Sequence, residues 1–447
     1  MPLAIDLLIE PGWIIPIEPA DTVLEGCALA VDQGRIAALL PIDQALSRFQ
    51  PREHLRLPGE VLLPGFVNLH CHAAMSLMRG YADDLPLMRW LQERIWPAEA
   101  KLMSPAFVRD GTFLAAWEML RGGITCFNDM YFFPGAAAEA VAEAGIRAVL
   151  GLTVIEFSSA YAADADDYLA KGLAIRDAWR DQQLLSFALA PHAPYTVGDR
   201  TFERIGTLAA QLDLPIHVHV HETQAEIDES QLHHGVRPLR RMDRLGLLGP
   251  NLIAVHAVHL QADEIELLAR TGCAVAHCPT SNMKLASGTA PVNELVNAGI
   301  RVGLGSDGAA SNNRLDLLQE MRHAALLAKT TSGDATSLAA HRVLRMATLD
   351  GAAALGLADT LGSLSVGKWA DLCAIRLDDW LSQPCYDPAS HLIYVAGREQ
   401  VTHVWVAGQL RLREGLPVDP VAGKLKEIAN SWHNHRGVLR SVGSLAN

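Results

Sequence analysis

The central part of the chain, from about residue 62 to about 362, alternates short apolar runs with longer amphipathic segments. Short apolar runs bounded by Gly, Pro or polar residues predict buried strands, whereas segments such as VRDGTFLAAWEMLRG and TFERIGTLAAQL predict helices. Eight runs are predicted as strands: VLLPGFVNLHCH, GITCFNDM, IRAVLGLTV, LLSFALAPHAPY, LPIHVHVHE, LIAVHAVHL, CAVAHCPTS and RVGLGSDG. Eight strands that alternate with helices predict an α/β fold, a (β/α)8 TIM barrel.

Both ends of the chain differ from this pattern, because their short apolar runs are broken by Gly and Pro. These runs are AIDLLIE, CALAVD and RIAALL near the start, and ADLCAIRL, HLIYVAG and THVWVAGQLRL after Gly362. They predict strands joined by turns, and since chain ends often lie close together, we expect them to form one small β-sandwich. The predicted segments are 1–62 and 363–420 for the sandwich, 63–362 for the barrel, and 421–447 for a helical C-terminal extension.

The composition narrows the class of protein. The chain has 447 residues, of which 50% are hydrophobic and 19% are charged. This balance excludes a disordered chain and suffices for a large core. The net charge is −13, and no basic stripe is present, which argues against a protein that binds nucleic acid.

The cysteines and the N-terminus indicate the compartment. The seven cysteines are scattered and form no CxxC pair, which favours a reducing environment over a disulfide framework. The N-terminus has no basic region before its apolar stretch, and no run reaches the roughly 18 apolar residues that span a membrane. We therefore expect a cytoplasmic protein that does not enter membranes. The apolar composition and the C-terminal extension also predict a homodimer, in which the extension packs on a neighbour.

Histidine and acidic residues gather at the C-terminal ends of the predicted strands, where barrel enzymes carry their chemistry. The first strand ends in His70-Cys71-His72, and alternate residues of a strand share one face. Two imidazoles on one face suit Zn²⁺ or another divalent metal, although two polar residues at a strand end also occur without one. The fifth strand ends in HVHVHE, in which His217, His219 and His221 alternate. Spacing alone leaves open which of these three binds metal.

Two further strand ends carry the same residue types. The sixth ends in His256-Ala257-Val258-His259, and the eighth contains Asp307 before a glycine. An isolated Asp-Gly more often forms an Asx-turn, and Glu222 alone could be an ordinary loop carboxylate. Polar residues at four strand ends of one barrel, however, favour a shared site over independent structural explanations.

These motifs resemble the amidohydrolase superfamily, in the branch of nucleoside and aminohydrolase deaminases that includes methylthioadenosine and S-adenosylhomocysteine deaminases. The resemblance covers nearly the whole chain. It is carried by LLPGFVNLHCHAAMSLMRGYADD, APHAPYTV, IHVHVHETQAE, HAVHL, CPTSNMKL, GLGSDGAASNN and GSLSVGKWADLCAI. Triazine chlorohydrolases and other deaminases share much of this pattern.

The resemblance implies a role for each candidate residue. It implies one Zn²⁺ per subunit, with Fe²⁺ as the alternative ion; the implied ligands are His70, His72, His219 and Asp307. It also implies three catalytic residues. Glu222 would transfer protons, Asp307 would accept the proton of the attacking water, and His256 would hydrogen-bond that water or the oxygen it adds.

The resemblance further implies that Trp90 stacks on a purine, Glu99 binds ribose hydroxyls and His192 contacts the substrate. Sequence alone favours a helix-face anchor for Trp90. His217 and His221 would either support the metal ligands without binding the ion or be structural, and His259 would be structural.

The expected substrate is an adenosine-type nucleoside, preferably methylthioadenosine. Family members that use S-adenosylhomocysteine well can hold its carboxylate with arginines after the third strand, but here no Arg occurs between Arg147 and Arg176. That segment contains Glu156 and three aspartates instead. An Arg from another element, such as Arg79 or Arg94, would overturn this preference.

Three other readings are weighed against the deaminase. One is a related aminohydrolase or chlorohydrolase that acts on a triazine, 8-oxoguanine or another free heterocycle. A binuclear amide hydrolase is disfavoured, because no Lys stands at the end of the fourth strand, where APHAPY lies. A non-enzymatic scaffold is disfavoured by the intact HxH, HVHE and SDG elements.

Overall fold

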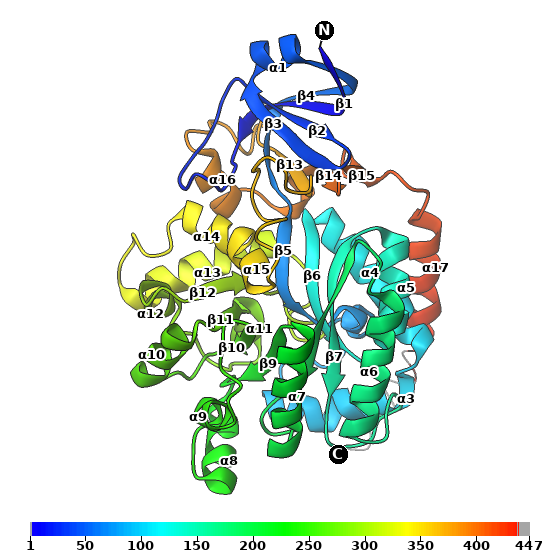
Figure 1. Cartoon of the computed structure of the whole chain (residues 1–447), viewed down its shortest axis with the longest axis vertical. Coiled ribbons are helices and arrows are strands. Elements are labelled where there is room, and N and C mark those ends of the chain that lie inside the picture. Colours follow the sequence, from blue (N-terminus) through cyan, green and yellow to red (C-terminus); the bar gives the residue numbers. More distant parts are fainter. Residues whose placement is uncertain (1, 436, 438–447) are drawn as a thin grey trace. The chain divides into compact units, whose positions relative to one another are not determined.

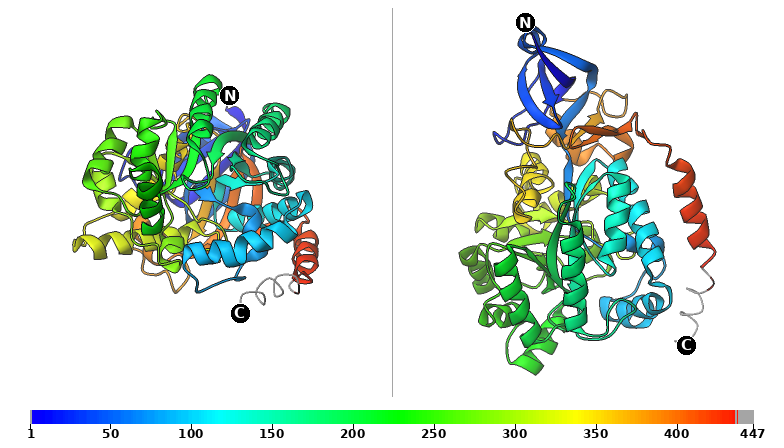
Figure 2. Two further views of the ribbon diagram at one scale, coloured as in Figure 1. Left: turned by 90° about the horizontal axis from the view of Figure 1, so that it is seen from below. Right: turned by 45° about the vertical axis from the view of Figure 1, so that its right-hand side comes forward.

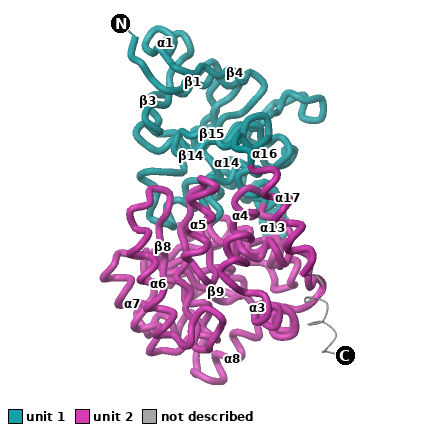
Figure 3. The backbone as a smooth tube through the Cα atoms, turned by 90° about the vertical axis from the view of Figure 1, so that its right-hand side faces the viewer, with its two compact units in different colours: residues 1–68, 118–126, 316–420 teal, residues 69–117, 127–315, 421–447 magenta. Residues whose placement is uncertain are grey.

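Two eight-stranded sheets organise the protein, in a computed structural model that describes residues 2–435 and 437 (Figure 1). The chain divides into two compact units (Figure 3). One unit comprises residues 1–68, 118–126 and 316–420, and the other comprises 69–117, 127–315 and 421–447. The segment boundaries expected from the sequence remain predictions. In the described residues, no helix has both the length and the apolar character needed to cross a membrane.

The first sheet confirms the predicted barrel and all eight of its strands. Its strands follow one another in chain order, and the registers from β7 to β12 are parallel. The backbone N–H of Asp307, just after β12, donates to the His70 carbonyl of β5 at 3.0 Å, so the last strand reaches the first. The strands are β5 (Phe66–Cys71), β6 (Ile124–Tyr131), β7 (Arg147–Val154), β8 (Leu185–Pro191), β9 (Ile216–Val220), β10 (Leu252–His256), β11 (Ala274–His277) and β12 (Arg301–Leu304).

Helices follow the barrel strands along the chain and lie outside them (Figure 2). In α7, Phe202, Ile205 and Ala209 recur at helical spacing and are buried, whereas the intervening residues are mostly polar, which explains why this segment forms an amphipathic helix. The helices of this region are α2 (Leu87–Trp90), α3 (Trp96–Leu102), α4 (Pro105–Arg121), α5 (Pro134–Ala144), α6 (Ala165–Trp179), α7 (Asp199–Leu212), α8 (Gln224–His234), α9 (Pro238–Arg244), α10 (Ala262–Thr271), α11 (Pro279–Lys284), α12 (Val292–Asn297) and α13 (Leu317–Ser332).

The second sheet joins both ends of the chain, as the sequence predicts. Its strand order is β16-β15-β14-β13-β4-β1-β2-β3, and its core cluster includes Leu29, Leu62 and Trp405. The sheet is mixed, because β1 and β4 are parallel whereas the other neighbours are antiparallel. Its strands are β1 (Leu3–Ile14), β2 (Cys27–Asp32), β3 (Arg35–Pro41), β4 (Phe49–Pro64), β13 (Leu372–Arg376), β14 (Val401–Val406), β15 (Gln409–Arg413) and β16 (Leu416–Pro417).

One predicted strand is wrong. The run HLIYVAG lies mostly in a helix, α16 (Pro388–Tyr394). Asp387 caps this helix by accepting the backbone N–H of Ala389, and Pro388 occupies its first turn. A capping Asp followed by Pro is a helix start, and it outweighs the strand preference of Ile and Tyr. The other helices that lie wholly in this unit are α1 (Ile42–Arg48), α13, α14 (Ala340–Met346) and α15 (Leu349–Ala354).

A last helix, α17 (Ala422–His433), occupies the start of the predicted C-terminal extension and lies beside α4 (Figure 2). The Trp432 indole N–H donates to Asp110 at 3.0 Å, and its ring meets that of Phe107 edge-on. Residues 436 and 438–447 of the extension lie outside the described residues.

Candidate active site

The carboxyl ends of four barrel strands bring five candidate residues together. His70 and His72 lie at the end of β5, His219 in β9, His256 at the end of β10, and Asp307 after β12. One ligand atom from each of His70, His72 and His219 lies within 4.8 Å of the others, and the same holds for His70, His256 and Asp307. These atoms are close enough to hold one metal ion.

Hydrogen bonds fix the tautomers of the imidazoles. Nδ1 of His72 lies 2.6 Å from the Met130 carbonyl, and Nδ1 of His219 lies 2.7 Å from the His192 carbonyl. A carbonyl only accepts, so both Nδ1 atoms carry a proton, and in the neutral form of each ring Nε2 is left with the lone pair that a metal needs. Nδ1 of His70 lies 2.9 Å from His217 Nε2, so one of these two ring nitrogens donates a hydrogen bond to the other.

The resulting donor set suits a cation. Nε2 of His219 lies 3.3 Å from Nε2 of His70, and Nε2 of His72 lies 3.3 Å from Asp307 Oδ1. Protonating the rings does not remove this clash of lone pairs, because burial lowers the pKa of His70 to about 4 and that of His219 well below its usual range. The residues present therefore fit a divalent metal that prefers imidazole and carboxylate ligands.

Asp307 is held in a fixed orientation. Its Oδ2 accepts hydrogen bonds from Ser281 Oγ at 2.6 Å and Ser311 Oγ at 2.8 Å, and its Oδ1 accepts the Gly308 N–H at 2.7 Å. Asp307 has a left-handed backbone with φ 57°, and His256 has φ 71°. Such strained conformations of non-glycine residues gather at functional sites, because the surrounding structure must hold them there.

Glu222 lies beside this cluster and is almost wholly buried. Its Oε2 is 3.6 Å from His256 Nε2, and its Oε1 accepts from Ser287 Oγ at 3.3 Å. Burial raises the pKa of Glu222, and the negative charge of Asp307 raises it further. A carboxyl group that holds its proton more tightly than usual suits proton transfer.

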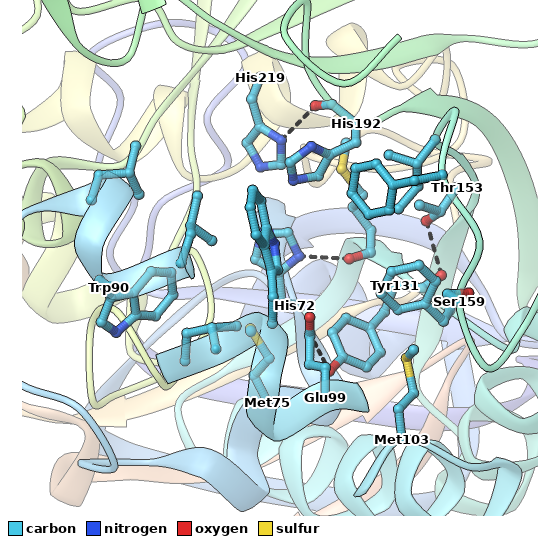
Figure 4. A pocket seen from close by; sticks show the side chains of 18 of the residues that line it. His72, Met75, Trp90, Glu99, Met103, Tyr131, Thr153, Ser159, His192 and His219 are labelled. Atoms are coloured by element: carbon cyan, nitrogen blue, oxygen red, sulfur yellow. Dashed lines mark hydrogen bonds between the residues drawn. The ribbon is translucent and has the colours of Figure 1, made fainter. Parts of the chain in front are cut away.

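A cavity of about 480 Å³ opens above these residues (Figure 4). Trp90, Glu99 and His192, the predicted substrate-binding residues, all line it. In Figure 4, His192 and His219 lie across the cavity from Glu99 and Met103. Trp90 precedes a π-helical turn over Leu91–Ile95, a rare geometry that is frequent at functional sites.

Two polar groups of the cavity have defined hydrogen bonds. Glu99 is 8% exposed and accepts from the Tyr131 hydroxyl at 2.7 Å; burial raises its pKa to about 7. The Thr196 hydroxyl donates to the Ala193 carbonyl and therefore accepts from His192 Nδ1 at 2.9 Å. His192 Nε2 is then left as an acceptor.

No lysine or arginine belongs to the described lining of the cavity. The segment after β7 contributes Phe157, Ser158, Ser159 and Ala160 to it. Its acidic residues make contacts outside the cavity. Glu156 accepts a hydrogen bond from the Gly198 N–H, and the three aspartates either cap α6 or form ion pairs with basic residues of α6 and α7. None of the acidic residues of this segment therefore lines the cavity.

The remaining histidines form hydrogen bonds with a neighbouring imidazole or with backbone groups. His217 touches His70, whereas His221 accepts the Leu239 N–H at Nε2 and lies 3.2 Å from the His259 carbonyl through Nδ1. His259 in turn contacts the Ser287 carbonyl through Nε2.

Several site residues were not identified from the sequence. Tyr131, Thr153 and Tyr195 line the cavity, and Ser281 and Asn282 bind Asp307 and His256. The signal for the last two was available, since both follow the seventh strand in the quoted motif CPTSNMKL. Tyr195 likewise stands in the quoted motif APHAPYTV, whereas Tyr131 gave no signal, because an isolated aromatic residue near a strand end is usually core.

Comparisons with known proteins show the family of the chain. Residues 61–411 match the model of the amidohydrolase family. A protein of Teredinibacter turnerae named "5-methylthioadenosine/S-adenosylhomocysteine deaminase" is 47% identical over 98% of this chain and 99% of its own. The crystal structure of an adenosine deaminase from Xanthomonas campestris with bound zinc has a TM-score of 0.96 and 49% identity, covering 99% of this chain and 100% of its own. Atrazine chlorohydrolase from Arthrobacter aurescens, complexed with zinc, has a TM-score of 0.88 and 26% identity over 95% of this chain and 99% of its own. The chain belongs to the amidohydrolase family.

Proposed function

We propose that the protein is a zinc-dependent deaminase that hydrolyses the exocyclic amino group of an adenosine-type nucleoside. The preferred substrate is 5′-methylthioadenosine, and the products are 5′-methylthioinosine and ammonia. The observation that carries this proposal is the convergence of the imidazoles of His70, His72 and His219 with Asp307 beside Glu222, at one end of a largely apolar cavity. The relatives named as deaminases of methylthioadenosine and S-adenosylhomocysteine support the substrate class.

His70, His72, His219 and Asp307 are the proposed ligands of one Zn²⁺ ion. When bound, the ion supplies a Lewis acid that lowers the pKa of a water molecule from about 15.7 towards about 7. Imidazole and carboxylate ligands also accept Fe²⁺, and elemental analysis of the purified protein distinguishes the two ions.

Glu222 and Asp307 transfer protons in this proposal, and His256 assists them by hydrogen bonding. The oxygen of water adds to the purine carbon that bears the amino group, while Glu222 donates a proton to the adjacent ring nitrogen. Glu222, now ionised, takes the remaining proton of the added hydroxyl and passes it to the amino nitrogen, which leaves as ammonia as the carbonyl forms; the proton on Asp307 then returns to Glu222. Asp307 accepts the proton of the water, and His256 hydrogen-bonds its oxygen.

The cavity binds the nucleoside through three contacts. Trp90 stacks on the purine, Glu99 accepts hydrogen bonds from the ribose hydroxyls, and His192 contacts the substrate at its acceptor Nε2. Glu99 faces the ligand from a buried position where water competes little, so its hydrogen bonds contribute strongly to affinity.

Replacing Glu99 by Ala is expected to raise the KM for adenosine about 10-fold to 100-fold, because hydrogen bonds to a charged group contribute about 1.5–3 kcal/mol. The measurement is the KM of adenosine compared with that of 2′,3′-dideoxyadenosine, which lacks the two hydroxyls. The KM of the dideoxy substrate should change little. Equal KM values for adenosine in the variant and the wild type would remove the ribose assignment.

Methylthioadenosine is expected to exceed S-adenosylhomocysteine in kcat/KM by about 10-fold or more, because a carboxylate that enters an apolar site without a cationic partner loses its hydration. The described cavity lining contains no lysine or arginine that could replace the lost water around the carboxylate. Spectrophotometric rates at equal substrate concentrations decide the matter. Equal or faster turnover of S-adenosylhomocysteine would mean that a basic group reaches the substrate tail.

A further inference from the structure

The loop between β9 and α8 carries Glu222, and a second buried carboxylate lies against its backbone. The strand ends at Val220, and His221 adopts a left-handed conformation with φ 58°. This turn takes the backbone N–H groups of His221 and Glu222 out of the sheet. Buried N–H groups need another acceptor, because leaving them unpaired is costly.

Glu226, in the first turn of α8, supplies both acceptors. Its Oε1 accepts the His221 N–H and its Oε2 accepts the Glu222 N–H, each at 2.9 Å. Glu226 is only 5% exposed. One carboxylate thus fixes two successive peptide units, and the second of these belongs to the proposed proton carrier.

This arrangement differs from an ordinary capping box. In that motif, the acidic residue at the third helical position accepts the N–H of the N-cap residue itself. Here the N-cap is Thr223, whose hydroxyl accepts the Glu226 N–H at 3.4 Å, whereas the Glu226 carboxylate extends to the two residues before the cap. The helix does not require these two contacts for its own N-terminus.

The carboxylate head of Glu222 has weak anchors by comparison. Its contacts are a 3.3 Å hydrogen bond from Ser287 and a 3.6 Å approach to His256. The direction of the Glu222 side chain therefore depends on the position of its backbone, which Glu226 holds.

We propose that Glu226 is a positioning residue for proton transfer, which fixes the backbone of Glu222 so that its carboxyl group meets the purine ring nitrogen. This inference rests on the proposed function. It assigns to Glu226 an effect on the chemical step and none on metal binding or on nucleoside affinity.

The Glu226→Gln variant tests the assignment. A carboxamide has one acceptor oxygen, and its NH2 group faces the second backbone N–H, so one of the two contacts is lost. We expect kcat for methylthioadenosine to fall about 10-fold to 100-fold, as small displacements of catalytic groups do, while KM and bound zinc stay at wild-type values.

Two controls on the same helix separate positioning from a loss of stability. Ser230→Ala removes a buried hydroxyl that donates to the Val236 carbonyl at 2.8 Å, and Asp228→Asn changes an exposed carboxylate. Both should keep kcat at the wild-type value, although Ser230→Ala should lower the melting temperature. In a Glu222→Gln background, adding Glu226→Gln should lower kcat no further, because the two residues act through one group.

Each outcome decides between the alternatives. Wild-type kcat in Glu226→Gln, or an equal fall of kcat in Ser230→Ala, overturns the inference and leaves the proposed function intact. Retained turnover in Glu222→Gln overturns the proton-transfer role of Glu222 and, with it, the inference, whereas absence of deamination by the zinc-loaded wild type overturns the proposed function. If Glu226→Gln does not fold, Glu226→Asp takes its place, since the shorter side chain cannot reach both N–H groups. In the wild-type protein, hydrogen exchange at the His221 and Glu222 amides should be as slow as in β9, and fast exchange would contradict the inference.

Discussion

Replacing Glu222 by Gln is expected to lower kcat for deamination by about 10²-fold to 10⁴-fold while the metal stays bound. Gln has the size of Glu and keeps the hydrogen bond from Ser287, but it cannot release and recover a proton. Glu222 is not a proposed metal ligand, and its nearest proposed partner, His256, lies 3.6 Å away. The variant should therefore separate chemistry from metal binding.

The measurement combines stopped-time assays of ammonia release with the zinc content of the same samples. A matched control is Glu229→Gln, which changes an exposed carboxylate on α8 and should retain wild-type kcat. Turnover within a few-fold of wild type, with zinc bound, would eliminate the proton-transfer role of Glu222.

Removing the metal is expected to abolish deamination and to lower the melting temperature. Without a cation, the lone pairs of His70, His72 and His219 face one another and Asp307 across short distances. Binding to the folded state alone stabilises a protein by about 2.7 kcal/mol when the free ligand is at 100 times its Kd. Both activity and melting temperature should therefore recover when zinc is returned.

The test is dialysis against a chelator, followed by activity and thermal unfolding before and after one equivalent of zinc. Asp307→Asn is the companion variant: it should bind zinc less tightly, because a neutral amide replaces an ionised ligand. Full activity in protein shown by elemental analysis to be free of metal would refute the metal centre.

The sequence predicts the barrel well because its strands are buried on both sides and read as continuous apolar runs. The strand-end residues were readable for a related reason: a buried His70 or Asp307 is out of place in an apolar run unless it has a function. The helix at Pro388–Tyr394 was predicted as a strand because its apolar residues fit a short strand equally well. The signal for the helix is the capping Asp387, which stands just before its first turn.

The supporting contacts of the site lay beyond sequence reasoning. The acceptors that orient His72 and His219 are backbone carbonyls, of Met130 and His192, and every residue type carries one. The sequence likewise could not show that Glu226 holds the backbone of Glu222, because its partners are backbone N–H groups whose direction depends on the left-handed turn at His221.

The most direct test of the proposed function is the reaction of zinc-loaded protein with 5′-methylthioadenosine, followed by ultraviolet absorbance and by ammonia release. The proposal predicts one ammonia per nucleoside consumed, with 5′-methylthioinosine as the product and slower turnover of adenosine and S-adenosylhomocysteine. No turnover of any of the three nucleosides by protein that holds its zinc, together with turnover of a triazine or a free purine base, would contradict it.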